Sequence, residues 1–199
     1  EIFSLPLYLL CGMARRRRWL SQEAALKYFL LGAFSSAFFL FGVALLYGYA
    51  ASFSYAGVAQ AIVEDQAPRV LLLAGLVMVA VGLLFKVGAV PFHAWTPDVY
   101  TGAPTPVTGF MAIATKTAAV AALLRVFYVA LGGARWDWQP IIATVAVATM
   151  VVGAVVGLVQ QDIKRLLAYS SIAHAGFILA GFVAAVGATA KGGVSSVGS

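Results

Sequence analysis

Long apolar stretches separated by short polar segments make up most of this 199-residue sequence. Uncharged stretches cover residues 28–50, 138–161 and 166–190, and each exceeds the roughly 20 residues that an α-helix needs to cross a bilayer core of about 30 Å. Two further stretches, 70–97 and 99–124, are also long enough, but each contains one lysine. The pattern predicts an all-α, polytopic membrane protein.

The polar residues, prolines and paired glycines between these stretches predict about six transmembrane helices in one membrane domain, residues 1–199. The helices are expected near residues 1–13, 22–49 (with Ser21 as its cap), 68–99, 105–131, 138–159 and 163–186. The third helix is expected to be discontinuous near residues 87–93, because Gly88 and Pro91 interrupt a sequence otherwise suited to a helix. Residues 52–69 are expected to form a polar loop. The short first stretch and the Gly/Ser-rich tail indicate a fragment of a larger protein.

The composition and the distribution of charge agree with a membrane protein. Of all residues, 62% are hydrophobic and 10% are charged, whereas soluble domains carry about a quarter charged residues. The net charge of +6 includes the run Arg15–Arg18, which lies between two apolar stretches. Loops on that side carry six Lys and Arg residues against three on the other, so we expect the Arg15–Arg18 loop to be cytoplasmic. This placement favours a membrane loop over a nucleic-acid-binding patch.

Few residues that support redox, metal or hydrolytic chemistry occur in the sequence. Cys11 is its only cysteine, and its two histidines, His93 and His174, are far apart. The sequence contains no nucleotide-binding loop, haem-ligand pair or nucleophile constellation. We therefore expect a chain that moves a solute, without a catalytic residue, metal or cofactor of its own.

Lys116 is the strongest candidate for a functional residue. It lies about 16 Å from the nearer end of its expected helix, at about 1.5 Å per residue, whereas a lysine stem reaches only about 6 Å. A lone charge at the bilayer centre costs roughly 2.5–3.5 kcal/mol. Lys116 can be a packing residue bonded to backbone carbonyls, or a member of an ion or proton relay, because burial favours the neutral form of an amine and so allows proton exchange.

Lys86 is a second candidate, because it directly precedes the expected helix break. On a continuous helix it would lie about 27 Å from Pro68, close enough to the inner face for its ammonium to reach water. Gly88 and Pro91 favour another interpretation, since broken helices at membrane depth occur in protein interiors or beside water, where transporters place ion sites.

Lys27, His93 and His174 are weaker candidates. Lys27 lies in the first turns of its helix, where its ammonium can reach the membrane surface. His93 follows the expected break, and His174 lies one turn after Ser170 and Ser171 on the same helix face. Either histidine can be a hydrogen-bonded packing residue instead of a proton carrier.

Residues 85–108, F-K-V-G-A-V-P-F-H-A-W-T-P-D-V-Y-T-G-A-P-T-P-V-T, closely resemble the antiporter-like membrane subunits of respiratory complex I, NADH:quinone oxidoreductase. The resemblance is strongest to the group of bacterial subunit N and mitochondrial subunit 2. It extends to E-I-F-S-L-P-L-Y at residues 1–8, to E-A-A-L-K-Y-F-L-L-G-A-F-S-S-A-F-F-L-F-G at residues 23–42, and to Q-D-I-K-R-L-L-A-Y-S-S-I-A-H-A-G-F at residues 161–177. The K-R-L-L-A-Y-S-S-I part is shared with sister subunits and identifies the superfamily alone.

The resemblance implies a fragment of a fold of about 14 helices, of which the six expected here correspond to the fifth to tenth. Glu1 then matches the glutamate of the family's fifth helix, and Lys86 matches the lysine of its discontinuous seventh helix, with which that glutamate is thought to pair. Lys116 matches a relay lysine in the eighth helix, and Lys27 matches a further family lysine. The family's exit residue belongs to its twelfth helix, which lies beyond this stretch.

The function implied is that of a proton-translocating membrane-arm subunit in a bacterial plasma membrane. NADH, FMN, iron–sulfur clusters and quinone would belong to partner subunits, and the partners of this chain would be sister antiporter-like subunits, lipid, protons and internal water. Two alternatives stay open: a subunit of an Mrp-type cation/proton antiporter or membrane-bound hydrogenase, and a structural membrane anchor whose lysines only pack.

Overall fold

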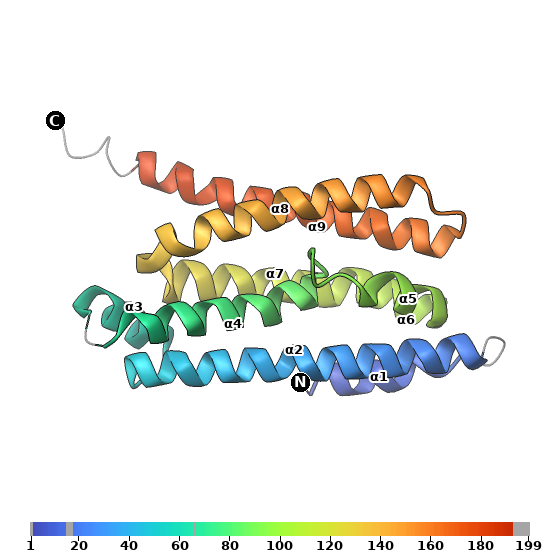
Figure 1. The fold of residues 1–199 in the computed structure, drawn as a ribbon, viewed down its shortest axis with the longest axis horizontal. Coiled ribbons are helices and arrows are strands. Elements are labelled where there is room, and N and C mark those ends of the chain that lie inside the picture. Colours follow the sequence, from blue (N-terminus) through green and yellow to red (C-terminus); the bar gives the residue numbers. More distant parts are fainter. Residues whose placement is uncertain (1, 15–17, 66, 193–199) are drawn as a thin grey trace.

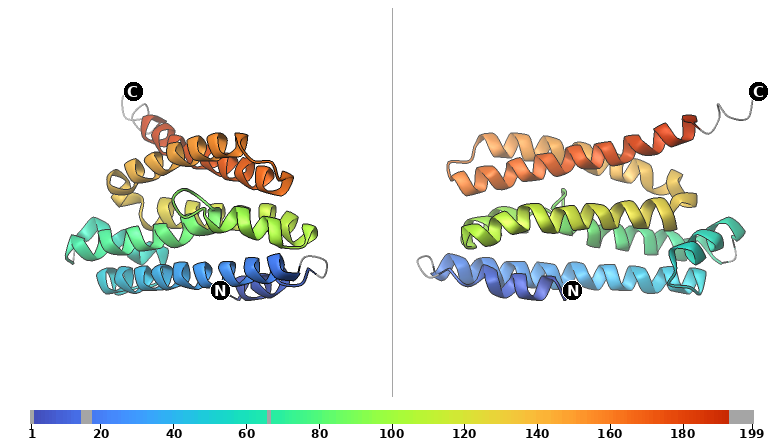
Figure 2. Two further views of the ribbon diagram at one scale, coloured as in Figure 1. Left: turned by 45° about the vertical axis from the view of Figure 1, so that its right-hand side comes forward. Right: turned by 180° about the vertical axis from the view of Figure 1, so that it is seen from behind.

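The computed structural model describes residues 2–14, 18–65 and 67–192, with side chains as far as residue 185. These parts form helices and connecting turns, without a strand. Figure 1 shows the helices lying roughly side by side in three layers, with α1 and α2 in one outer layer, α8 and α9 in the other, and α4 and α7 between them. The two further views in Figure 2 keep this order. The expected all-α fold is confirmed.

Five helices in the described part of the chain are long and apolar enough to cross a membrane. They are α2 (Arg18–Ala50), α4 (Arg69–Val87), the continuous helix Thr105–Ala130, α8 (Arg135–Leu158) and α9 (Ile163–Gly192). The chain is therefore a multi-pass membrane protein. The first expected helix, near residues 1–13, is described as α1 (Ser4–Cys11), whose eight residues fall short of a bilayer span.

The helix Thr105–Ala130 is not uniform along its length. It starts as α6 (Thr105–Phe110), widens into the π-helical turn η1 (Met111–Thr115), returns to α7 (Lys116–Leu124) and ends in the π-helical η2 (Arg125–Ala130). In η1 the Thr115 hydroxyl donates to the carbonyl of Met111 at 2.5 Å. Such widened turns frequently occur at functional sites in helices.

Two glycines set how closely neighbouring helices approach, one between layers (α2 and α4) and one within a layer (α8 and α9). A Cβ atom on Gly42 of α2 would collide with the backbone of α4 at Gly75 and Val79, and one on Gly153 of α8 would collide with the backbone of α9 at Ala173. Association of membrane helices depends on this kind of close packing, since lipid tails are as apolar as the side chains. The bundle is thus held by shape at least as much as by apolar surface.

The segment 52–69 was wrongly expected to be a loop, because it contains α3 (Tyr55–Glu64). The side chain of Ser54 accepts a hydrogen bond from Gly57 N at 3.0 Å and so caps the helix. Val58 and Ala61 are buried in the main hydrophobic core, while the exposed residues include both Gln60 and Val63. The length of ten residues hid this helix from a search for apolar stretches long enough to cross a membrane.

The beginning of α2 also differs from the expectation. The helix starts at Arg18, and Ser21 lies inside its first turn, where its hydroxyl donates to the carbonyl of Cys11 at 2.6 Å. The Ser21 oxygen also accepts from Ala14 N at 3.1 Å. Ser21 therefore ties α1 to α2 across the connecting loop instead of capping α2. Of the run Arg15–Arg18, only Arg18 belongs to the described residues.

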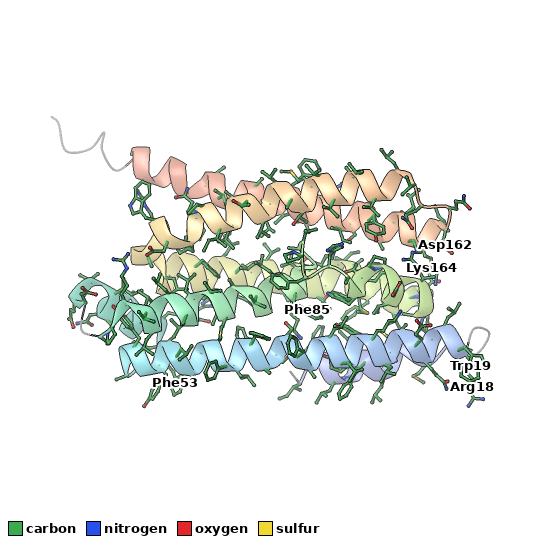
Figure 3. All side chains as sticks on the ribbon, viewed as in Figure 1. Arg18, Trp19, Phe53, Phe85, Asp162 and Lys164 are labelled. Atoms are coloured by element: carbon green, nitrogen blue, oxygen red, sulfur yellow. The ribbon has the colours of Figure 1, made fainter. Side chains whose placement is uncertain are left out.

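Aromatic residues mark the two ends of the bundle. Trp19 is 86% exposed near the start of α2, and Trp136 is 75% exposed near the start of α8. Figure 3 shows Arg18, Trp19, Asp162 and Lys164 at one end and Phe53 at the opposite end. Tryptophans are enriched at membrane–water interfaces, so these ends are the two membrane surfaces. We call the end with Arg18 and Lys164 the arginine end.

Candidate functional site

The helix break lies between α4 and α5 (Trp95–Gly102) and separates them by residues 88–94. Gly88 has φ +79°, a left-handed conformation that side chains with a Cβ atom rarely adopt, and its N–H donates to the carbonyls of Leu84 and Phe85. The peptide bond between Val90 and Pro91 is cis. The sequence prediction was a break near 87–93, with Gly88 and Pro91 as its cause.

Backbone groups near the break find partners on other parts of the chain. Trp95 Nε1 donates to the carbonyl of Phe85 at 3.0 Å, and Val90 N donates to Thr149 Oγ1 of α8, also at 3.0 Å. Backbone groups freed by a broken helix cannot be satisfied by lipid, so they need such protein partners. The break is therefore held by α5 on one side and α8 on the other, although Pro91 and Ala94 within it are exposed.

Lys86 occupies the last turn of α4, midway along the bundle. Figure 3 places the adjacent Phe85 about halfway between the two ends. The break and α5 lie between the end of α4 and the arginine end of the bundle. Lys86 therefore does not lie at the membrane surface, as it would on a continuous helix. Its Nζ donates to the hydroxyl of buried Ser4 on α1 at 2.5 Å. Glu1, its expected partner, lies outside the described residues.

Lys116 begins α7 and is only 7% exposed. Its Nζ donates to two atoms of Ser171 on α9, the hydroxyl oxygen at 2.5 Å and the carbonyl oxygen at 3.0 Å. The same Nζ lies 4.0 Å from the position that a Cβ atom would take on Gly88. The ammonium is thus held between α9 and the helix break, away from lipid. Among the described acidic side chains, none forms an ion pair with Lys116.

Further polar groups are buried around Lys116. The Thr96 hydroxyl approaches the same side of Gly88, and the Tyr100 hydroxyl lies beside Ser171; neither oxygen has a hydrogen-bond partner of ordinary geometry in the described part of the chain. Buried hydroxyl groups are almost always satisfied by protein or by ordered water. A cavity of about 370 Å³ adjoins this cluster and is lined by Lys116, Ser171 and His174 among others. Most of its lining is apolar, and Lys116, Thr117, Ser171 and His174 are its polar side chains.

The weaker candidates fall in different places. His174 Nδ1 lies 2.8 Å from the carbonyl oxygen of Ser170, and its ring lines the cavity next to Lys116. His93 lies in the break and faces the ring of Tyr169, with ring centroids 6.4 Å apart. Lys27 lies near the arginine end, where it forms ion pairs, and is not part of the cluster around Lys116.

The structure adds functional candidates that the sequence did not single out. Ser4 holds the partly buried Lys86 and Ser171 holds the buried Lys116, and Thr96 and Tyr100 supply buried hydroxyls. Their common signal is a hydroxyl side chain in a largely apolar sequence, where such groups tend to form contacts between helices. The arrangement can hold a protonated amine at mid-depth beside hydroxyl groups that can both accept and donate hydrogen bonds. In the part of the chain that the structure describes, no group of His, Cys, Asp and Glu could hold a metal ion.

Comparison with known proteins gives one consistent family. The family model described as "NADH:quinone oxidoreductase/Mrp antiporter, TM" matches residues 1–195. The chain is 68% identical over 185 residues to NADH-quinone oxidoreductase subunit N of Rhodococcus opacus, covering 93% of this chain and 34% of that protein. The subunit N of Cutibacterium acnes is matched with the same identity and coverage. The chain spans about a third of the length of these relatives.

Solved structures show the same fold. A chain in respiratory complex I from Thermus thermophilus with bound aureothin is 45% identical, with a TM-score of 0.72 over 88% of this chain and 36% of that chain. A chain of the Mrp complex from Dietzia sp. is 24% identical, with a TM-score of 0.79 over 90% of this chain and 33% of that chain, and so supports the fold alone. The broken helix, the buried lysines and the match along nearly the whole sequence agree, and the chain belongs to the membrane-domain family shared by NADH:quinone oxidoreductases and Mrp antiporters.

Proposed function

We propose that this chain is the proton-conducting core of a membrane-arm subunit of NADH:quinone oxidoreductase. The observation that carries the proposal is Lys116, a buried lysine whose ammonium is held by Ser171 beside a helix break at mid-depth. Relatives with 68% identity are subunits N of this oxidoreductase, whereas the Mrp complex is matched at 24% identity, which favours the oxidoreductase over the antiporter. NADH, FMN, iron–sulfur clusters and quinone would then bind to partner subunits.

In this proposal Lys86 and Lys116 alternate between their protonated and neutral forms. Lys86 lies in the last turn of α4, where the negative end of the helix dipole favours its protonated form. Glu1 would stabilise that form further, and separation of the pair would favour release of the proton. The proton would pass through buried hydroxyls and water around the break to Lys116, which has no ion-pair partner among the described acidic residues and can accept it as a neutral amine.

The Ser171 hydroxyl serves two purposes in this scheme. It accepts a hydrogen bond from the protonated lysine, and it can donate one to the neutral amine after the proton leaves. The Ser171 carbonyl can accept from either form, since the neutral amine keeps two N–H donors, but it bonds more strongly to the charged ammonium. The site can therefore hold both protonation states of Lys116 without rearranging α9. The onward path would leave Lys116 through the cavity that it lines together with His174.

The subunit would lie in a bacterial plasma membrane with its arginine end in the cytoplasm. Its partners would be the sister antiporter-like subunits and the redox subunits, together with lipid, protons and internal water. The alternative of a structural anchor predicts that the lysines pack without carrying protons. It offers no reason for a buried ammonium next to unsatisfied hydroxyls at a helix break.

Replacement of Lys116 by methionine in the complete enzyme tests the proposal. Methionine keeps the length and the apolar stem but carries no proton. We expect proton uptake into membrane vesicles, normalised to NADH oxidised and to assembled complex, to fall, while NADH oxidation by an artificial acceptor is retained. Arg135→Met is the matched control, since the Arg135 guanidinium lies over the Trp136 ring at the surface, 4.8 Å from its centroid. Unchanged proton uptake in Lys116→Met would reject the relay and leave the anchor.

A further inference from the structure

Four charged side chains of alternating sign form a chain at the arginine end. Lys27 of α2 pairs with Glu23 at 2.6 Å and with Asp98 of α5 at 2.8 Å. Arg165 of α9 lies 3.4 Å from the other oxygen of Asp98. The four side chains surround a cavity of about 380 Å³. We call them the end network: Glu23, Lys27, Asp98 and Arg165.

Asp98 is the centre of the end network, because it alone joins two cations from different helices. It lies in the first turn of α5, the short helix that follows the break. A helix of eight residues is not stable by itself and depends on its neighbours for its position. The Asp98 carboxylate links α5 to α2 on one side and to α9 on the other.

The contact between α5 and α9 continues from Asp98 towards the buried lysine. Lys164 Nζ donates to the carbonyl of Ala103, just beyond the end of α5, at 3.1 Å. Tyr100, two residues after Asp98, has its hydroxyl beside Ser171, which lies six residues after Arg165 on α9. Six residues of α-helix span about 9 Å, so α5 and α9 meet both at the end network and at the residue that holds Lys116. A shift of α5 along α9 would move the Tyr100 hydroxyl relative to Ser171 and so change the surroundings of the hydroxyl that holds Lys116.

We propose that Asp98 is a positioning residue for proton transfer through Lys116. By holding Lys27 and Arg165 together it fixes α5 against α2 and α9, and it thereby keeps Tyr100 beside Ser171, the residue that holds the Lys116 ammonium. This inference rests on the proposed function and assigns Asp98 no proton of its own. The competing possibility is a surface ion pair without mechanistic effect, because half-exposed pairs often contribute little.

The experiment uses the complete enzyme with Asp98→Asn, which removes the charge at constant shape, and Asp98→Glu, which keeps it. Asp137→Asn is the matched control, because it removes the ion pair between Asp137 and Arg69 at the opposite end of the bundle, whose atoms are also 2.8 Å apart. Two quantities are measured: protons taken up per NADH oxidised, and hydrogen–deuterium exchange of backbone amides in residues 95–102. Ser171→Ala is combined with Asp98→Asn to test whether the two residues act together.

We expect Asp98→Asn to lower the protons moved per NADH by about half and to speed amide exchange in α5, with Asp98→Glu restoring most of both. The double variant should pump like Ser171→Ala alone, because Asp98 acts through Ser171. Should Asp98→Asn prevent assembly, Arg165→Gln removes the α9 side of the contact and carries the same expectation. Normal pumping in Asp98→Asn, or losses that add independently to those of Ser171→Ala, would overturn the proposal. Failure of the proposed function is recognised separately, since Lys116→Met would then pump normally.

Discussion

The ammonium of Lys116 and the left-handed Gly88 face each other across the helix break, with Nζ 4.0 Å from the place of a glycine Cβ. Lys116, whose charge needs solvation at membrane depth, thus lies against Gly88, the residue at which α4 ends. The break removes side-chain bulk at this point and leaves polar backbone nearby. The two features that the sequence showed separately, a lone lysine and a broken helix, form one site.

Gly88→Ala is expected to impair the site around Lys116, because it strains the backbone at the helix break. A Cβ atom at φ +79° is strained, by roughly 1–2 kcal/mol, and it would also press on the Thr96 hydroxyl at 2.9 Å. We expect lower proton uptake per NADH and lower thermal stability of the purified enzyme. Gly109→Ala is the control, since a Cβ atom there meets nothing within 4 Å. Equal behaviour of the two variants would contradict the role given to the left-handed turn.

Ser171→Ala should slow proton transfer more than Ser170→Ala. Loss of a hydrogen bond to a charged group costs about 1.5–3 kcal/mol, and each 1.4 kcal/mol in a barrier is about tenfold in rate. The Ser171 hydroxyl contacts Lys116, whereas the adjacent Ser170 contributes its carbonyl to His174. Proton uptake in vesicles at matched NADH oxidation measures the difference. Similar rates in both variants would remove Ser171 from the relay.

Lys86→Ala should lower pumping while NADH oxidation by an artificial acceptor is retained. Lys86→Arg should fail as well, although it keeps the positive charge, because arginine stays protonated at any accessible pH and cannot release a proton. The measurement is proton uptake normalised to quinone reduction and to assembled complex. Full pumping in Lys86→Arg would mean that Lys86 is a fixed electrostatic partner and not a carrier.

Gly42→Leu should destabilise the contact between α2 and α4. A Cβ atom at Gly42 already approaches Val79 N to 2.7 Å, and larger groups force the helices apart, at a typical cost of about 1–3 kcal/mol. Gly48→Leu, on the same helix but with nothing within 4 Å, should be tolerated. Thermal unfolding of the purified enzyme in detergent, monitored as loss of this subunit from the complex, distinguishes the two variants. Equal melting temperatures would argue against the packing described here.

The proposed orientation predicts opposite labelling of two exposed tryptophan positions. With a membrane-impermeant maleimide on intact cells, Trp136→Cys should react from outside, and Trp19→Cys should react only after the membrane is opened. Both positions are well exposed, and Cys11, the cysteine of this sequence, is buried; labelling is read against the same cells without either substitution. The reverse pattern would place the arginine end outside the cytoplasm.

The membrane-spanning helices could be predicted because each of them is marked in the sequence by a continuous apolar stretch of sufficient length. The break could be predicted for the same reason, since Gly88 and Pro91 act on their own backbone. Helix α3 could not be found by apolar length, because only one side of it is buried and its cap at Ser54 is a short-range signal in a polar segment.

The side-chain contacts that form the site could not be predicted from the sequence. Lys86 meets Ser4 across 82 positions, and Lys27 meets Asp98 across 71, so their partners depend on how helices far apart in the chain pack together. Lys116 could be singled out because a charge far from both helix ends needs a partner. That its partner is Ser171 follows only from the place that α9 takes beside α7 in the fold.

The depth of Lys116 has an electrical consequence. A full crossing of one elementary charge in a membrane potential of 100 mV changes its free energy by about 2.3 kcal/mol. A proton carried to Lys116 from one surface crosses about half of that field, which corresponds to about 1.2 kcal/mol. Since 1.4 kcal/mol is about tenfold in an equilibrium constant, the protonated fraction of Lys116 would respond several-fold to energisation of the membrane. The buried lysine would then sense the voltage that its own transport builds.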